Sequence, residues 1–181
     1  MVETPPMSPE KIITRVTYLQ IQAPFPERPA IAPRDGVSVE RAMNPSLPLY
    51  RQLYSGVGGS YQWSARILMA DEALARIVQD SRVEVHVLSV HGKTAGYVEL
   101  DGRTEGEMEI AYFGLFPEFY GKKLGSFLLD WAVGSLAKRP GLKRIWVHTC
   151  TLDHPGALST YRKAGFVPYL EKDEWVDPLP T

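Results

Sequence analysis

Residues 116–126 read FPEFYGKKLGS and join a predicted strand to a predicted helix. One apolar face with i, i+3, i+4 and i+7 spacing indicates that helix: Leu124, Phe127, Leu128 and Trp131. The start of a helix leaves backbone N–H groups unpaired and carries partial positive charge. Glycines in the turn allow close approach of a ligand, and two lysines add charge. The segment therefore predicts a phosphate or pyrophosphate site, with an ordinary strand-to-helix turn and solvated lysines as the alternative interpretation.

Alternating apolar residues predict strands on both sides of this turn. We expect them over residues 12–21, 83–90, 94–100, 107–116, 143–149 and 166–170. Helical spacing is found over residues 45–54, 71–79 and 155–164, with Asp71 as the N-cap of the second segment, and glycines within residues 55–60 predict a loop. An antiparallel meander is thus followed by strand–helix–strand–helix–strand. This order predicts an α/β fold with a mixed, mostly antiparallel sheet of about six to seven strands flanked by helices.

A second motif follows at residues 154–166, which read HPGALSTYRKAGF. It predicts a helix closed by Gly165, a residue suited to a helix C-terminus. Together with the glycine-containing turn, it resembles the GCN5-related N-acetyltransferase (GNAT) superfamily, in which a later helix carries a tyrosine and ends in Gly-Phe. Tyr161, Gly165 and Phe166 match that ending. The resemblance covers roughly residues 83–170, and the two motifs together are more specific than either alone.

The resemblance implies an acyl-CoA N-acyltransferase-like fold that uses acetyl-coenzyme A (acetyl-CoA). It implies an N-acetyltransferase domain over residues 36–175. Residues 1–35 are rich in proline, and we expect an irregular segment there apart from the first strand. The implied cofactor-binding residues are Leu115, Phe116, Tyr120, Gly121, Lys122, Lys123, Leu124, Gly125, Ser126, His154 and Tyr161.

The sequence departs from the family pattern at a few positions. The family turn usually reads Arg/Gln-x-x-Gly-x-Gly/Ala, and here those three positions hold Tyr120, Lys123 and Gly125. Pyrophosphate contacts should survive because they use backbone amides, which Lys123 still provides. The family often has asparagine seven residues before the tyrosine, where this chain has His154. A histidine there can still form a hydrogen bond with the pantetheine arm.

Acetyl transfer to an amine needs a base, a donor to the developing oxyanion and an acid for the thiolate. An acidic residue at Glu109 resembles the base position of several family members, and Glu107 lies on the same strand face as a second candidate. Two alternatives remain: a chain of water molecules could act as the base, or both glutamates could simply lie on a solvated sheet face. The resemblance implies an oxyanion donor among the backbone N–H groups of residues 114–116. Tyr161 is the expected acid, because its ordinary pKa is not far from that of a thiol.

Composition narrows the range of partners. The net charge of −1 does not favour nucleic acid or an anionic membrane, so we expect neither. No apolar run approaches a membrane span, residues 1–10 lack an apolar signal core, and we expect a cytoplasmic protein. The expected partner is a small-molecule or peptide amine, and a homodimer is plausible. The histidines show no metal-ligand spacing, so no metal is expected.

Two other functions fit parts of the sequence. The chain could be a non-catalytic acyl-CoA-binding regulatory module that binds the cofactor without turning over an amine. Alternatively, Cys150 with His148, two residues away on one strand face, could support a cysteine-dependent hydrolase. Several aromatic residues could line an acceptor pocket or belong to the core: Tyr54, Tyr61, Trp63, Tyr97 and Tyr112.

Overall fold

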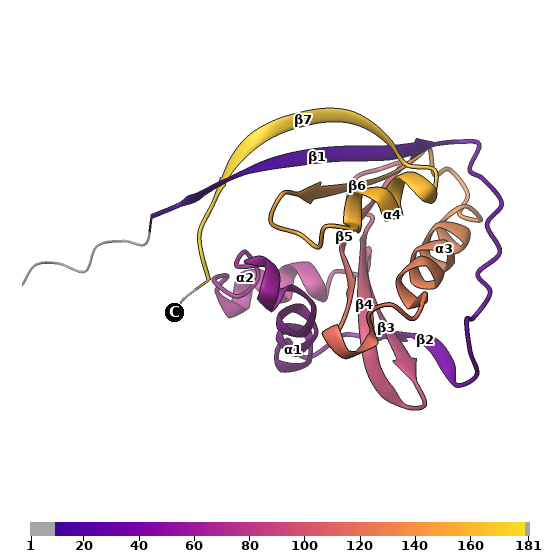
Figure 1. The fold of residues 1–181 in the computed structure, drawn as a ribbon, viewed down its shortest axis with the longest axis horizontal. Helices are drawn as coiled ribbons and strands as arrows, with labels where there is room; N and C mark the ends of the chain where they lie inside the picture. The colour runs from indigo at the N-terminus through magenta and orange to yellow at the C-terminus, as the bar shows by residue number, and fades with distance from the viewer. Residues whose placement is uncertain (1–9, 180–181) are drawn as a thin grey trace, which may run out of the picture.

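The computed structural model describes residues 10–179 and contains one seven-stranded sheet (Figure 1). Its strands are β1 (Ile12–Gln22), β2 (Val37–Ala42), β3 (Val83–Val90), β4 (Lys93–Asp101), β5 (Glu107–Leu115), β6 (Arg144–Cys150) and β7 (Val167–Val176). They lie in the order β2-β3-β4-β5-β6-β1-β7, and only the β5–β6 pair is parallel. The predicted α/β class and mostly antiparallel sheet are therefore confirmed. Strand β2 was not expected, and residues 1–9 of the predicted N-terminal segment lie outside the described part.

Helices cover both faces of the sheet (Figure 1). Helices α1 (Leu47–Gly58) and α2 (Asp71–Val78) pack on one face, and α3 (Leu124–Leu136) and α4 (Ala157–Lys163) pack on the other. Short 3₁₀ turns η1 (Gly59–Tyr61) and η2 (Pro117–Phe119) follow α1 and β5. No helix within residues 10–179 is both long and apolar enough to cross a membrane.

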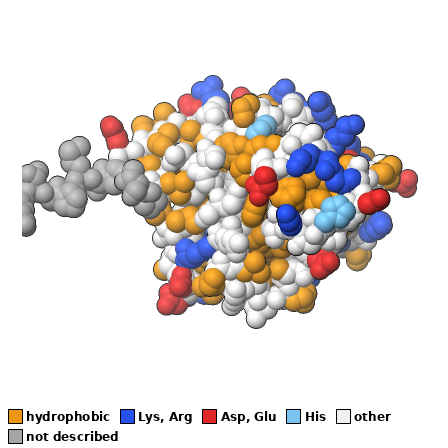
Figure 2. Space-filling view, turned by 60° about the horizontal axis from the view of Figure 1, so that its bottom comes forward, with side chains coloured by type: hydrophobic (Ala, Val, Ile, Leu, Met, Phe, Trp, Pro, Cys, Tyr) orange, Lys and Arg blue, Asp and Glu red, His pale blue; other side chains and the backbone are white. Residues whose placement is uncertain are grey.

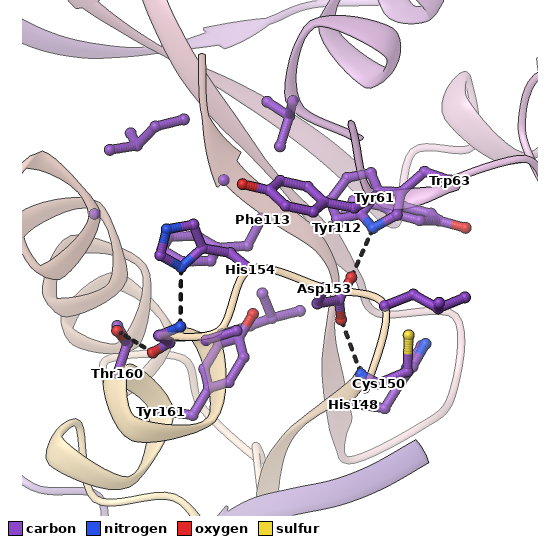
Figure 3. Close-up of a pocket in the computed structure, with 18 of the residues that line it drawn as sticks. Tyr61, Trp63, Tyr112, Phe113, His148, Cys150, Asp153, His154, Thr160 and Tyr161 are labelled. Carbon is purple, nitrogen blue, oxygen red and sulfur yellow. Dashed lines mark hydrogen bonds between the residues drawn. The ribbon is translucent and has the colours of Figure 1, made fainter. Parts of the chain in front are cut away.

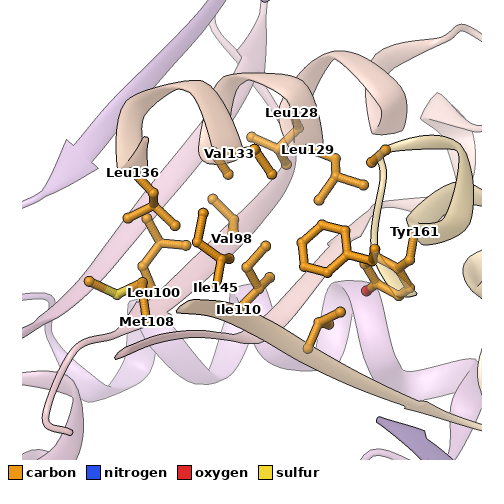
Figure 4. Packing of buried hydrophobic residues seen from close by; sticks show 14 of the residues in the cluster. Val98, Leu100, Met108, Ile110, Leu128, Leu129, Val133, Leu136, Ile145 and Tyr161 are labelled. Atoms are coloured by element: carbon orange, nitrogen blue, oxygen red, sulfur yellow. The ribbon is translucent and has the colours of Figure 1, made fainter. Parts of the chain in front are cut away.

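The larger core lies between α3 and the middle of the sheet (Figure 4). Leu128, Val133 and Leu136 of α3 are fully buried against strand residues such as Ile110 and Ile145. The expected apolar face is therefore confirmed at Leu124 and Leu128, whereas Phe127 and Trp131 are only partly buried at its edge. The packed face is completed by Leu129, Ala132, Val133 and Leu136. Its burial fixes where the helix begins, and so fixes the position of the preceding turn.

Two local predictions were wrong. Residues 55–60 do not form a loop, because α1 runs to Gly58 and η1 follows. A Cβ at Gly56 would meet the Phe116 ring at 2.5 Å, and one at Gly58 would meet the Trp63 ring at 2.3 Å. These glycines therefore make room for aromatic rings on a helix surface. The N-cap of α2 is Ala70 rather than Asp71, which is the first helical residue and whose carboxylate instead accepts a 2.6 Å hydrogen bond from Arg51.

The parallel pairing of β5 with β6 ends early. It joins residues 107–110 to residues 144–147, although β5 continues to Leu115 and β6 to Cys150. At the same point the register of β5 against β4 shifts, so that Glu99 pairs with Tyr112 and Leu100 with Ile110. The extra residue is Ala111, which makes a β-bulge. Beyond it β5 stays on β4, β6 stays on β1, and the two strands diverge.

A buried charged network lies beneath the bulge, between β4 and α1. The Glu99 side chain is 0% exposed and accepts hydrogen bonds from Tyr50 Oη at 2.5 Å and Arg66 Nη2 at 2.6 Å. The Arg66 guanidinium also lies 5.2 Å from the centroid of the Tyr112 ring. Burial raises the pKa of Glu99, and the Arg66 charge and the Tyr50 hydroxyl oppose that rise. The network ties α1, the segment after η1 and the bulged strand together.

We expect Arg66→Met and Glu99→Leu each to lower the free energy of unfolding by about 3–5 kcal/mol, because each leaves one charge buried without its partner. The double variant should lose less than either single variant, since no buried charge remains. Urea denaturation followed by circular dichroism measures all three. Asp173→Ala, which breaks the exposed pair with Arg15, is the control and should change little. Additive losses in the double variant would contradict the proposed coupling.

Candidate active site

A cavity of about 400 Å³ opens where β5 and β6 diverge. Its volume is in the range of small-molecule sites. The α3 end of the cavity is lined by residues of the 120–126 turn and of α4. The β1 end is lined by Thr14, Val16, Trp63, Ser64, Tyr112, His148, Cys150, Glu174 and Val176. On one face of the molecule, hydrophobic side chains gather across the middle with histidine, lysine and arginine side chains beside them (Figure 2).

The 120–126 turn presents unpaired backbone donors at the α3 end. Within the described residues, the N–H groups of residues 121–126 donate no hydrogen bond, whereas the Phe127 N–H donates to Lys123 O at 3.2 Å. Gly121 and Lys123 both have positive φ, at 72° and 59°. A lysine thus holds the left-handed conformation for which glycine is the usual residue. These donors, at the positive end of α3, suit an anion.

Most of the side chains predicted around the turn line this end, but two do not. Leu115, Tyr120, Lys123, Leu124, Gly125 and Ser126 line the cavity together with Gly121. The Phe116 ring packs against Gly56 of α1 instead. Lys122 folds back, so that its Nζ donates to Glu118 O at 2.6 Å and lies 5.1 Å from the Phe119 ring centroid.

Helix α4 brings Tyr161 into the cavity wall. Tyr161 is 5% exposed and packs against the Phe113 and Phe166 rings. Burial, with the nearby Asp153 charge, raises the pKa of Tyr161 well above that of a free tyrosine. The hydroxyl therefore stays protonated at neutral pH, but the raised pKa lies further from that of a thiol than the sequence argument assumed and makes the hydroxyl a weaker proton donor.

His154 lies near the mouth of the cavity with two tyrosines. Its Nδ1 accepts a hydrogen bond from the Gly156 N–H at 2.9 Å, and its ring centroid is 5.4 Å from that of Tyr120. Tyr120 and Tyr61 share a hydroxyl hydrogen bond of 3.0 Å. The turn, η1 and the loop before α4 therefore meet at this point.

Glu109 does not itself line the cavity, but His148 does. The His148 Nδ1 lies 3.5 Å from Glu109 Oε1. Both side chains belong to the face of the sheet that carries Tyr112. Glu107 lies on the same face and is 3.7 Å from Arg144 Nη2. The structure thus brings the predicted carboxylate next to a histidine that reaches the cavity.

Asp153 joins the walls of the cavity, and the sequence interpretation assigned it no role. It accepts hydrogen bonds from Trp63 Nε1 at 2.8 Å and from the Cys150 N–H at 2.9 Å (Figure 3). It also accepts one from Thr149 Oγ1 at 2.7 Å. Residues of β1 and β7 were missed as well, because their approach depends on strand order. A polar residue directly after β6 was the available signal for Asp153.

Cys150 lies in the same wall without the features of a nucleophile. Burial and the Asp153 charge raise the pKa of its thiol, which disfavours the reactive thiolate. Within residues 10–179, no three histidine, cysteine, aspartate or glutamate side chains come together as metal ligands.

The aromatic residues named in the sequence analysis fall into two groups. Four of them line the cavity: Tyr54, Tyr61, Trp63 and Tyr112. Tyr97 is fully buried in the core.

Solved structures share this fold. A GCN5-related N-acetyltransferase from Kribbella flavida matches with a TM-score of 0.62 and 16% identity over 93% of this chain and 60% of that chain. A GCN5-related N-acetyltransferase from Sphaerobacter thermophilus matches with a TM-score of 0.63 and 18% identity over 93% and 53%. An aminoglycoside acetyltransferase from an uncultured soil metagenomic sample matches with a TM-score of 0.57 and 17% identity over 74% and 90%.

The chain spans less than two thirds of the length of the first two of these structures. No curated protein matches the sequence. A family model described as the acetyltransferase (GNAT) family matches residues 48–166, more than half of the chain, and the chain therefore belongs to that family.

Proposed function

We propose that the chain is an N-acetyltransferase that moves the acetyl group of acetyl-CoA to a primary amine by direct attack in a ternary complex. The acceptor is a small molecule or a peptide. Membership of the family supports acyl transfer in general, and use of acetyl-CoA is typical of the family. The observation that carries the proposal is the row of unpaired N–H groups at residues 121–126, at one end of a cavity that continues through the sheet.

The residues at the α3 end fit coenzyme A. Unpaired amides at a helix start suit a pyrophosphate, and the Lys123 side chain lines the same end of the cavity. His154 and the wall of α4 would hold the pantetheine arm within the gap between β5 and β6. The bound cofactor would supply an acetyl thioester. Residues 36–175 would form the acetyltransferase domain, with β1 completing its sheet.

The Leu115 N–H is the proposed oxyanion donor. The Phe116 N–H is already used, since it donates to Ala95 O on β4 at 2.8 Å. Hydrogen-bonding direction alternates along an antiparallel strand, so Gly114 also faces β4 and the Leu115 N–H points to the opposite side. That is the side from which β6 has diverged. A donor fixed there by the sheet needs no rearrangement to stabilise negative charge.

We propose that Glu109, next to His148, provides the base function for the amine. Tyr161 would hold the proton that the departing thiolate takes. A non-catalytic acyl-CoA-binding module is the alternative, and it would bind the cofactor equally well without turnover.

Ser126→Asp tests the anion site. It places a carboxylate in the first turn of α3, where it should slightly stabilise the helix but repel a pyrophosphate. We expect at least about tenfold weaker acetyl-CoA binding by calorimetric titration, with an unchanged or higher melting temperature. Ser159→Asp, at the third residue of α4 and outside the cavity lining, is the matched control. Unchanged affinity of Ser126→Asp would contradict a coenzyme A site at this turn.

Tyr161→Phe tests the proposed acid. Loss of the hydroxyl should lower kcat by about 10²-fold and leave acetyl-CoA binding nearly unchanged, because the ring still fills its place. Thiol release over an amine panel measures turnover. Tyr169→Phe on exposed β7 is the control. Wild-type rates for both Tyr161→Phe and Glu109→Gln would rule out the assigned roles, and binding without turnover by the native chain would favour the regulatory module.

A further inference from the structure

The polar groups at the β1 end of the cavity are mostly engaged with one another. Asp153 accepts three hydrogen bonds from the walls around it. The Ser64 hydroxyl donates to Asp177 O, and Gln62 Oε1 accepts from the Leu179 N–H at 3.1 Å. The Tyr54 hydroxyl accepts from the Arg66 N–H at 3.3 Å. An acceptor rich in hydroxyl groups would therefore find few free partners here, and its desolvation would go uncompensated.

Positive charge is equally limited at this end. Among the described lining residues, Lys123 is the only lysine or arginine, and it belongs to the α3 end. The two nearby cations are already paired, Arg66 with Glu99 at 2.6 Å and Lys172 with Glu174 at 2.9 Å. A carboxylate on the acceptor would therefore be buried next to Glu174 and Asp153 without a cation to pair with.

The remaining surface is mainly apolar. The Trp63 and Tyr112 rings lie 5.2 Å apart between centroids, are tilted by 58° to each other and form one wall (Figure 3). Val16 and Val176 of the two long strands line the same end. Aromatic and aliphatic walls of this kind favour a planar apolar body, which can stack on them at low entropic cost.

One group of polar side chains at this end, the His148 corner, can still bind a nitrogen atom of the acceptor. The His148 side chain reaches the cavity beside Glu109, and Glu174 lines the same end after accepting a 2.7 Å hydrogen bond from Tyr18. A carboxylate and an imidazole attract an ammonium group and can accept its proton. This corner lies between β5 and β7, on the same sheet face as Tyr112.

Resting on the proposed function, we propose that the acceptor is a primary amine carried on a flat, mainly apolar body without a carboxylate. Its nitrogen lies at the His148 corner and its body lies against Trp63 and Tyr112. Amino acids, peptides and polyhydroxylated amines are disfavoured by the same surfaces. Trp63 is then a specificity-determining residue of the acceptor half.

Matched amines test this class. Thiol release from acetyl-CoA is measured with tryptamine, L-tryptophan, 2-phenylethylamine, L-phenylalanine, spermidine, kanamycin and an alanine tripeptide. We expect kcat/KM for each aromatic amine to exceed that of its amino acid by about 10²-fold, because the added carboxylate is buried without a partner. Tryptophan, kanamycin or the tripeptide matching tryptamine would overturn the substrate class and leave acetyl transfer intact. Failure to bind acetyl-CoA, or binding without acetylation of any amine, would overturn the proposed function itself.

Substitutions at the wall supply the second readout. Trp63→Ala should raise the KM for tryptamine by about tenfold with unchanged acetyl-CoA affinity, because one stacking face is lost. Trp63→Phe keeps an aromatic ring and should recover most of the loss, which separates stacking from the hydrogen bond to Asp153. Trp175→Ala is the control, since Trp175 is 64% exposed and lies outside the cavity lining. An unchanged KM in Trp63→Ala would overturn the assignment of this wall.

Discussion

The early end of the parallel ladder between β5 and β6 determines the rest of the site. Pairing stops at Ile110 and Val147, although both strands continue. A strand that loses one neighbour exposes N–H and C=O groups on that side, and here the exposed side faces the interior of the cavity. The same divergence places the start of α3 and the wall of α4 on either side of the gap. The cavity, the free Leu115 N–H and the turn before α3 therefore have one common cause.

The divergence is held in place from the α1 side of the sheet. The bulge at Ala111 turns Tyr112 onto the Glu99 side, where its ring packs against Tyr54 and Trp63 and under the Arg66 guanidinium. Helix α1 lies close enough for Val57 to occupy the space of a Cβ at Gly114. The end of β5 is thus drawn toward α1 rather than toward β6. The buried Arg66–Glu99 pair, which is costly to bury, therefore lies at the bulge, where β5 departs from regular pairing.

The parts that the sequence predicted are those encoded locally. The apolar face of α3, the strand alternation and the Gly-Phe ending after α4 each depend on short-range spacing, which side chains reveal directly. Gly56 and Gly58 were misread because they make room for the Phe116 and Trp63 rings, which the tertiary fold brings there. The contributions of Thr14 and Glu174 could not be foreseen for a related reason. They reach the cavity because β1 lies between β6 and β7, and strand order is a long-range property.

At the β1 end, the hydrogen bonds that hold the cavity walls in place also limit which polar groups a ligand can reach. Asp153 joins Trp63 to the end of β6, and Ser64 joins the loop after η1 to the residue after β7. Each pairing fixes a wall and at the same time removes a polar group from contact with an acceptor. Each such hydrogen bond therefore makes the walls more rigid and leaves fewer polar groups free in the cavity. Under the proposed function, the chemistry toward an acceptor would concentrate where His148 meets Glu109, because His148 lines the cavity and its Nδ1 lies 3.5 Å from the Glu109 carboxylate.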